Sequence, residues 1–157
     1  MKQEKLKELF YMMFEFMPLY NQTMGSIYRK DYDVEPRLNK NQKKALFIIK
    51  KHGKIILSAL GRALDMQKGS LTTLVDLLEK HEFVSRAIDN DDRRKFWLFL
   101  TPKGEEYISV LMGNFEKEFS QMFDKIDLED ISQMIDSISF SKNVLKKIKQ
   151  TGGVLCR

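Results

Sequence analysis

One stretch limits the possible folds more than any other, because an amphipathic helix leads directly into two short strands around a polar turn. In residues 67–81, apolar side chains recur at three- and four-residue steps, at Leu71, Leu74, Val75 and Leu78. Residues 83–88 and 95–100 have the composition and apolar patterning of strands. The polar run 89–92 between them predicts a turn. The sequence therefore predicts a helix followed by a β-hairpin.

The residues before this stretch predict a second helix close to the first. A short helix over 58–64 and a tight turn at Asp65-Met66 precede it, which makes a helix-turn-helix. Upstream, Asn39 is suited to cap a helix that ends at Gly53, and 54–57 is a short strand candidate. Long helices are expected over 2–28, with a kink or break at Pro18, from Thr101-Pro102 to about 125, and from Asp127 onward. The predicted fold is mainly α, a winged helix-turn-helix with a small antiparallel β-hairpin as its wing.

Basic charge is concentrated in the middle of the chain. Residues 37–104 hold 15 Lys and Arg against seven Asp and Glu, whereas the flanks are slightly acidic. This distribution suits a surface that binds a polyanion. Charge alone fits a solvated basic surface equally well.

Two sets of residues are candidates for contact with DNA. The face of the 67–81 helix opposite its apolar stripe has short polar side chains that suit the major groove. Its residues are Gln67, Lys68, Gly69, Ser70, Thr72 and Thr73. The hairpin turn ends in Asp92, Arg93, Arg94 and Lys95, and arginines at such a tip suit the minor groove. On its own, the helix surface also fits an ordinary solvent-facing helix.

Residues 71–104 together resemble the signature of the MarR family of transcriptional regulators. The matching positions are Leu74-Val75-Asp76, Leu78-Glu79-Lys80, Asp92 with Arg94, and Leu100-Thr101 with Gly104. The order of the preceding helices also fits, so the resemblance covers essentially the whole chain.

The resemblance implies a homodimer that binds a pseudo-palindromic operator and regulates transcription, most simply as a repressor. Residues 1–36 and 105–157 would form the dimerisation base and 37–104 the DNA-binding lobe. Ser58, Arg62 and Lys95 would contact phosphates, and Arg94, oriented by Asp92, would enter the minor groove. The resemblance also implies that a small phenolic or lipophilic acid acts as effector. Plausible lining residues, for which a plain core or dimer seam is the alternative, are Tyr11, Phe14, Met17, Tyr20, Ile48 and Tyr107.

The sequence departs from the family pattern at four positions. Gln67 replaces a common Ser cap, Gly69 is unusual at a contact position, Leu77 replaces a basic residue, and Glu82 replaces a Gly. Gly69 and Leu77 leave open an alternative function, a winged-helix module that binds protein and has weak or no affinity for DNA.

Several other classes of function are not expected. No run of apolar residues is long enough to span a membrane, and the N-terminus predicts a helix instead of a signal peptide. No catalytic motif, cofactor fingerprint or metal-ligand spacing is present, so we expect neither an enzyme nor a metal site. The single cysteine, Cys156, fits a reducing cytoplasm, and its role stays open.

Overall fold

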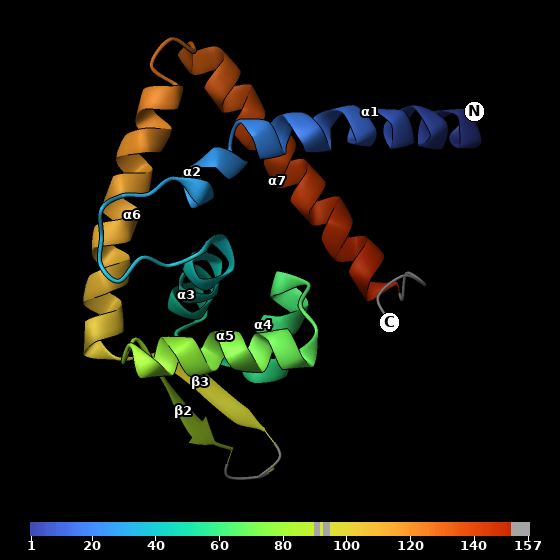
Figure 1. Cartoon of the computed structure of the whole chain (residues 1–157). Coiled ribbons are helices and arrows are strands. Elements are labelled where there is room, and N and C mark those ends of the chain that lie inside the picture. The colour runs from blue at the N-terminus through green and yellow to red at the C-terminus, as the bar shows by residue number, and fades with distance from the viewer. Residues whose placement is uncertain (90–91, 93–94, 152–157) are drawn as a thin grey trace. The chain divides into compact units, whose positions relative to one another are not determined.

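The computed structural model describes residues 1–89, 92 and 95–151. The chain divides into two compact units, Met1–Phe119 and Ser120–Arg157. The helices are α1 (Lys2–Gln22), α2 (Gly25–Arg29), α3 (Lys40–His52), α4 (Leu57–Leu64), α5 (Lys68–Lys80), α6 (Pro102–Met122) and α7 (Leu128–Gln150). The strands are β1 (Lys54–Ile56), β2 (Val84–Ile88) and β3 (Phe96–Leu100) (Figure 1). The predicted division of the chain into three segments by role stays a prediction.

The wing belongs to a three-stranded antiparallel sheet with the order β1-β3-β2. Leu98 at the centre of β3 is opposite Arg86 on β2 and Ile55 on β1. The prediction of a two-stranded wing was therefore incomplete, because the short strand after α3 pairs with the far side of β3. This pairing fixes the wing to the end of α3.

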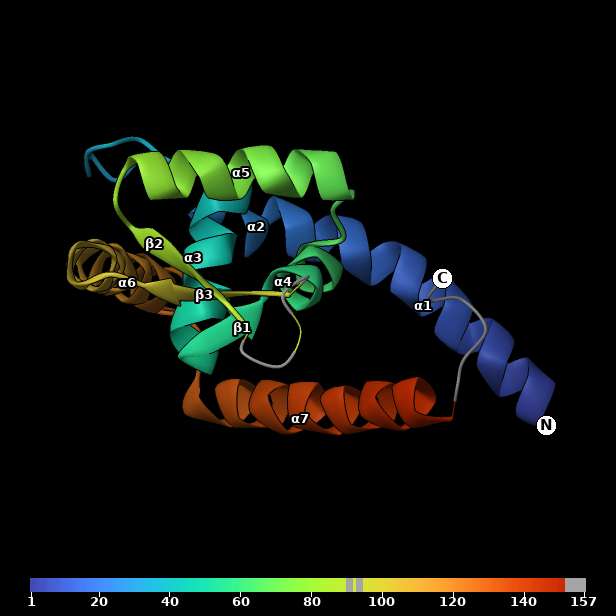
Figure 2. The ribbon, with the colours of Figure 1, turned by 90° about the horizontal axis from the view of Figure 1, so that it is seen from below.

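The core of the first unit lies where α3, α5 and the sheet meet. The predicted stripe of α5 is buried at all four positions, Leu71, Leu74, Val75 and Leu78. These four side chains share a core with six residues that are each at most 1% exposed, namely Leu46, Ile49, Leu60, Phe83, Leu98 and Ile108. Seen from below, α5 lies along one side of the sheet, and its opposite face stays in solvent (Figure 2).

Two helix starts follow the predicted capping chemistry. The Asn39 side chain accepts hydrogen bonds from the backbone N–H groups of Asn41 and Gln42, and the Gln42 side chain accepts one from Asn39 in return. At α6, the Gly104 N–H donates to the Thr101 hydroxyl oxygen at 3.0 Å, and Pro102 occupies the first helical position.

The predicted helix over 2–28 is wrong as a single element, since it divides into α1 and α2 at Thr23-Met24. Pro18 does not end it, and α1 continues for four residues beyond. The Thr23 hydroxyl donates to the Leu19 carbonyl at 2.8 Å, and the Thr23 backbone leaves helical geometry. A short polar side chain that bonds locally thus marks the break.

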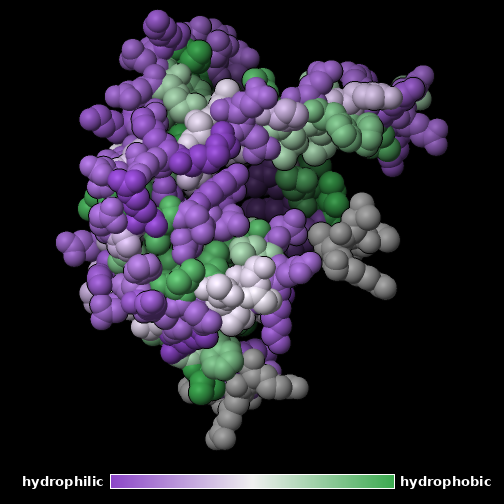
Figure 3. Space-filling model, viewed as in Figure 1, coloured by the Kyte–Doolittle hydropathy of each residue, from purple (hydrophilic) through white to green (hydrophobic). Residues whose placement is uncertain are grey.

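None of the 21 residues of α1, all of which the structure describes, is buried. Hydrophobic side chains gather along this helix in Figure 3. In the second unit, α7 begins at an Asp127 side chain that accepts from the Asp130 N–H, and none of its 23 described residues is buried either. Among the helices that the structure describes, none has the length and apolar character needed to cross a bilayer.

Candidate nucleic-acid interface

The helix-turn-helix forms because α4 and α5 approach closely at a glycine. A Cβ atom on Gly61 would lie 2.9 Å from the end of the Leu71 side chain, so a larger residue here would require Leu71 to shift. The turn is closed by the Met66 N–H, which donates to the Gly61 carbonyl at 3.0 Å. Asp65 ends α4 in the left-handed conformation, with φ of 52°. These local contacts therefore fix the orientation of α5 relative to α4.

The outer face of α5 has the polar character that the sequence predicts. Gln67, Lys68, Gly69, Ser70 and Thr73 are exposed, and Thr72 is half-buried. Both threonine hydroxyls donate to carbonyls one turn earlier, Thr72 to Lys68 at 3.0 Å and Thr73 to Gly69 at 3.2 Å. Their oxygens still have acceptor capacity toward solvent.

The start of α5 offers backbone donors. Gln67 occupies the N-cap position, and its side chain makes no capping hydrogen bond. The N–H groups of the first turn therefore keep their capacity to bind an anion such as a phosphate. With Gln67 in place of the serine cap that is common in the family, no side chain of the N-cap residue competes for these N–H groups.

The structure gathers predicted DNA-contact residues from three elements around one groove. Ser58 and Arg62 come from α4, Lys68 from α5, and Lys95 from the residue just before β3. The groove has a volume of about 520 Å³. The family resemblance and the polar face of α5 predicted these residues separately, and the fold places them together.

The base of the wing is held by Asp89, a residue that the sequence analysis did not single out. Its side chain accepts from the Asp92 N–H at 2.9 Å and from the Trp97 indole N–H at 2.6 Å. Its own N–H donates to the Lys95 carbonyl at 3.0 Å. Aspartate in a polar turn is the sequence signal for such a clamp, because its side chain accepts hydrogen bonds from nearby backbone N–H groups. The predicted contact residues Arg93 and Arg94 lie outside the described part of the chain.

Comparison with known proteins agrees with this geometry. Residues 38–96 match the model of the MarR family. The chain is 30% identical over 89 residues to the uncharacterised HTH-type transcriptional regulator YhbI of Bacillus subtilis, covering 57% of this chain and 58% of the relative. It is 31% identical over 96 residues to the regulator SarZ of Staphylococcus saprophyticus, covering 58% and 65%. The helix-turn-helix segment of the chain is therefore similar to the MarR family.

Solved structures support the same fold over more of the chain. A mutant of MarR from E. coli, crystallised with operator DNA, superposes with a TM-score of 0.64 at 18% identity, covering 87% of this chain and 92% of that one. The MarR-family regulator SP03579 superposes with a TM-score of 0.70 at 13% identity, covering 94% and 97%. At these identities the likeness supports the fold. The sequence matches span about three fifths of the two curated relatives.

At several positions of the MarR-family signature, the structure gives a physical reason for the residue type. A Cβ on Gly104 would lie 2.0 Å from the Phe83 carbonyl oxygen, so the chain entering β2 and the start of α6 can cross only at glycine. Thr101 ties the same crossing together, since its N–H donates to the Phe83 carbonyl and its hydroxyl to the Glu82 carbonyl. Asp76 on α5 forms an ion pair with Arg86 on β2.

The family's usual glycine position is occupied by Glu82, which adopts a left-handed φ of 61°. Its carboxylate pairs with Lys103 at 2.7 Å, and this hydrogen bond lowers the pKa of the Glu82 carboxyl. The turn geometry is thus kept without glycine. Leu77, the other departure on α5, is 40% exposed.

The predicted MarR-family effector residues do not gather around one cavity. Tyr11, Phe14, Met17 and Tyr20 are exposed on α1, and Ile48 is half-buried on α3. Tyr107 lines a cavity of about 160 Å³, but the remaining lining comes from the 29–38 segment, α3 and α6. The residues beside Tyr107 are Arg29, Asp31, Tyr32, Val34, Arg37, Leu38, Lys43 and Leu111.

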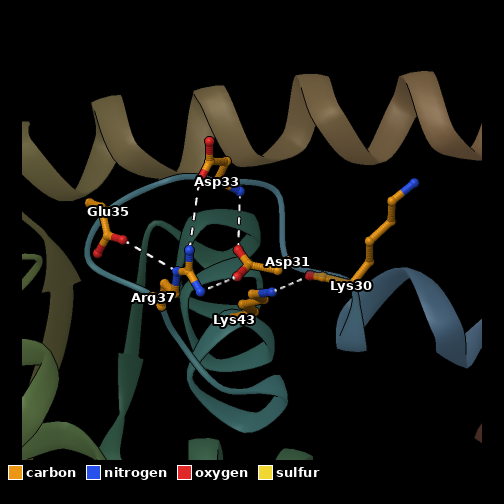
Figure 4. Close-up of polar contacts among 6 residues, drawn as sticks. All are labelled: Lys30, Asp31, Asp33, Glu35, Arg37 and Lys43. Carbon is orange, nitrogen blue, oxygen red and sulfur yellow. Dashed lines mark hydrogen bonds and ion pairs between the residues drawn. The ribbon is translucent and has the colours of Figure 1, made fainter.

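The wall of this cavity is held by ionic contacts within the 30–37 loop (Figure 4). Arg37 pairs with Asp31 at 2.9 Å, with Glu35 at 3.3 Å and with Asp33 at 3.7 Å. Lys43, only 6% exposed, donates to the Lys30 carbonyl at 2.8 Å, and burial lowers the pKa of its ammonium.

Tyr107 closes the cavity from α6. Its hydroxyl donates to the Pro36 carbonyl at 2.9 Å. Burial and the nearby carboxylates Glu35 and Asp31 raise the pKa of this phenol to about 12. The hydroxyl therefore stays protonated, and it remains a donor, throughout the neutral range. Among the described residues, no cluster of His, Cys, Asp and Glu is arranged to hold a metal ion.

Proposed function

We propose that this chain is a sequence-specific DNA-binding transcriptional regulator of the MarR family that acts as a homodimer. The observation that carries the proposal is the exposed polar face of α5 beside a groove whose rim holds Arg62, Lys68 and Lys95. The α5 helix suits the major groove, and the rim cations suit the flanking phosphates. A MarR homologue from E. coli crystallised with operator DNA supports this assignment.

The two terminal helices support a homodimer. On α1, eleven large apolar side chains between Leu6 and Tyr20 are exposed, among them Phe10 at 56% and Phe14 at 65%. On α7, Leu128, Ile135, Ile138, Phe140, Leu145 and Ile148 are exposed. Continuous apolar surfaces of this kind are rare on monomers and indicate association. We infer that a second copy of the chain covers them.

Sedimentation velocity tests this dimer. Phe14→Asp on α1 places a charge on the apolar face, whereas Glu15→Gln changes a neighbouring polar position and serves as the control. The wild type and the control sediment as dimers, and Phe14→Asp shifts toward monomer. A monomeric wild type at micromolar concentration would contradict the dimer.

The finer parts of the proposal concern the direction of regulation. We infer a repressor on a pseudo-palindromic operator, released when a small phenolic or lipophilic acid binds near Tyr107. The cavity there supports this, since Arg29, Arg37 and Lys43 line it against one carboxylate, Asp31, and the excess of cations favours an acidic group. Titrating salicylate as a probe while the protein is bound to DNA tests the release.

Fluorescence anisotropy tests sequence-specific binding directly. The protein is titrated against a duplex from upstream of its own gene and against a scrambled duplex. Thr73→Ala, on the exposed face of α5, reduces the preference between duplexes, and Lys117→Gln, an exposed lysine on α6, leaves it unchanged. Equal affinity for both duplexes would contradict specific recognition.

The alternative is a winged-helix module that binds protein. The exposure of Leu77 on α5 favours it, because an apolar side chain suits a protein surface better than a phosphate. Absence of duplex binding in the same titration would favour this alternative.

A further inference from the structure

The groove at the base of the wing has a hydrophobic lining that contact with phosphates does not require. Its walls come from the end of β1, α4, the turn after α4, the start of α5 and the start of β3. The apolar members are Ile56, Leu57, Met66, Leu71 and Phe96. The volume of about 520 Å³ falls within the range of small-molecule sites.

The charged side chains of the groove are three cations and one carboxylate. Arg62 and Lys68 have no ion-pair partner in the part of the chain that the structure describes, while Lys95 pairs with Asp92 at 3.5 Å. Asp65 supplies the carboxylate. The groove therefore combines an apolar surface with a net positive rim, and two of its cations are available to a ligand.

The lining is partly accessible. Leu57, Ile56 and Met66 are half-buried and Phe96 is 36% exposed, whereas Leu71 is 4% exposed and belongs to the core. DNA phosphates need only the cations at the rim, because the sugar–phosphate backbone gains little from an apolar recess. An apolar recess beside unpaired cations is complementary to a molecule that has both parts.

We propose that this groove binds a small amphipathic anion, a carboxylate or sulfonate attached to an apolar chain or ring. The acid group lies against Arg62 and Lys68, and the apolar part covers Met66 and Phe96. The site shares no lining residue with the cavity beside Tyr107. Its regulatory consequence rests on the proposed function, because the ligand occupies the same cations that would contact operator phosphates.

Methyl NMR of methionine tests the site independently of DNA. The protein, one of whose nine methionines is Met66, is labelled at the methionine methyl groups, and Met66→Leu assigns the signal. Octanoate is the probe, and 1-octanol is the neutral molecule of the same chain length. Arg62→Gln removes one rim cation, and Lys117→Gln is the matched control at a distant exposed lysine.

We expect octanoate to shift the Met66 methyl signal saturably. Binding of 1-octanol to the wild type, and of octanoate to Arg62→Gln, should be about tenfold weaker, since a charge-assisted hydrogen bond is lost. Lys117→Gln binds as the wild type does. An unmoved Met66 signal at millimolar octanoate, or equal shifts with 1-octanol, would overturn the proposal.

Anisotropy with a DNA duplex separates the two proposals. Octanoate is expected to weaken duplex binding by the wild type and to have a smaller effect on Arg62→Gln. A Met66 signal that moves with duplex and not with octanoate assigns the groove to the DNA backbone alone and overturns the ligand site. If no duplex binds, the proposed function fails, and the methyl titration still decides whether the groove takes an anion.

Discussion

The Arg86 guanidinium on β2 lies 2.9 Å, Nε to Oε2, from the Glu79 carboxylate on α5, and it also pairs with Asp76 one turn earlier. The wing strand is thus tied ionically to the helix proposed to read DNA. Because its side chain is only 26% exposed, Arg86 is shielded from much of the solvent that weakens surface ion pairs. The two elements proposed to contact DNA are held in a fixed relation.

Arg86→Ala should therefore weaken DNA binding although Arg86 points to α5. We expect a loss of about 1 kcal/mol in stability, typical of a partly shielded ion pair, and a several-fold loss of duplex affinity. Arg86→Lys retains the charge and loses the forked geometry, so its stability and duplex affinity should lie between those of the wild type and Arg86→Ala. Thermal melts and duplex titrations measure both effects, and unchanged affinity in Arg86→Ala would remove this tie from the account.

Gly104→Ala should be strongly destabilising, by roughly 2–4 kcal/mol, since the added methyl overlaps the Phe83 carbonyl and the backbones must separate. Gly113→Ala provides the control within the same helix. Nothing lies within 4 Å of a Cβ there, so we expect stabilisation of about 0.5–1 kcal/mol from helix propensity. Urea denaturation measures both, and similar effects of the two substitutions would contradict the crossing described here.

Glu82→Gly should raise the thermal midpoint, because glycine adopts the φ of 61° without strain. The exposed pair with Lys103 that it removes contributes little. Glu82→Gln is the control, since it keeps the backbone strain and removes the charge. A lower midpoint for the glycine variant would mean that the ion pair outweighs the strain.

Gly69→Ala should separate stability from DNA affinity. A Cβ at Gly69 meets nothing within 4 Å, so alanine is expected to stabilise α5 by up to about 0.5 kcal/mol. If the backbone of α5 approaches the bases closely at this point, the methyl lowers duplex affinity by about 1 kcal/mol. Melting curves and anisotropy measure the two quantities, and equal affinity would show that Gly69 is outside the contact surface.

Local patterns predicted most of the fold. The stripe of α5, the Asn39 cap and the Thr101-Pro102 start depend on residues at most a few positions apart, and the structure confirms each. Periodicity missed the division of the first helix, because the apolar pattern continues across Thr23-Met24 where the backbone turns. The pairing of β1 with β3 was also missed, since it joins residues more than forty positions apart.

The candidate site was predicted residue by residue but not as an arrangement. The family resemblance indicated Arg62, the polar face of α5 indicated Lys68, and the hairpin turn indicated Lys95. The fold shows that these residues share one groove with an apolar lining. The Asp89 clamp and the Arg86 pairs depend on contacts between elements, for which a single sequence has no periodic signal. The burial of Lys43 was not predicted, because this residue lies in a basic run that resembles a solvated surface.

The central claim is that the polar face of α5 and its neighbouring cations bind DNA, and the salt dependence of duplex binding tests it most directly. Anisotropy titrations of the wild type, Arg62→Gln and Lys117→Gln are run over a series of salt concentrations. We predict steeply falling affinity for the wild type and for Lys117→Gln, with the slope of Arg62→Gln reduced by about one released counterion. An affinity that does not depend on salt, or identical slopes for the wild type and Arg62→Gln, would contradict the account.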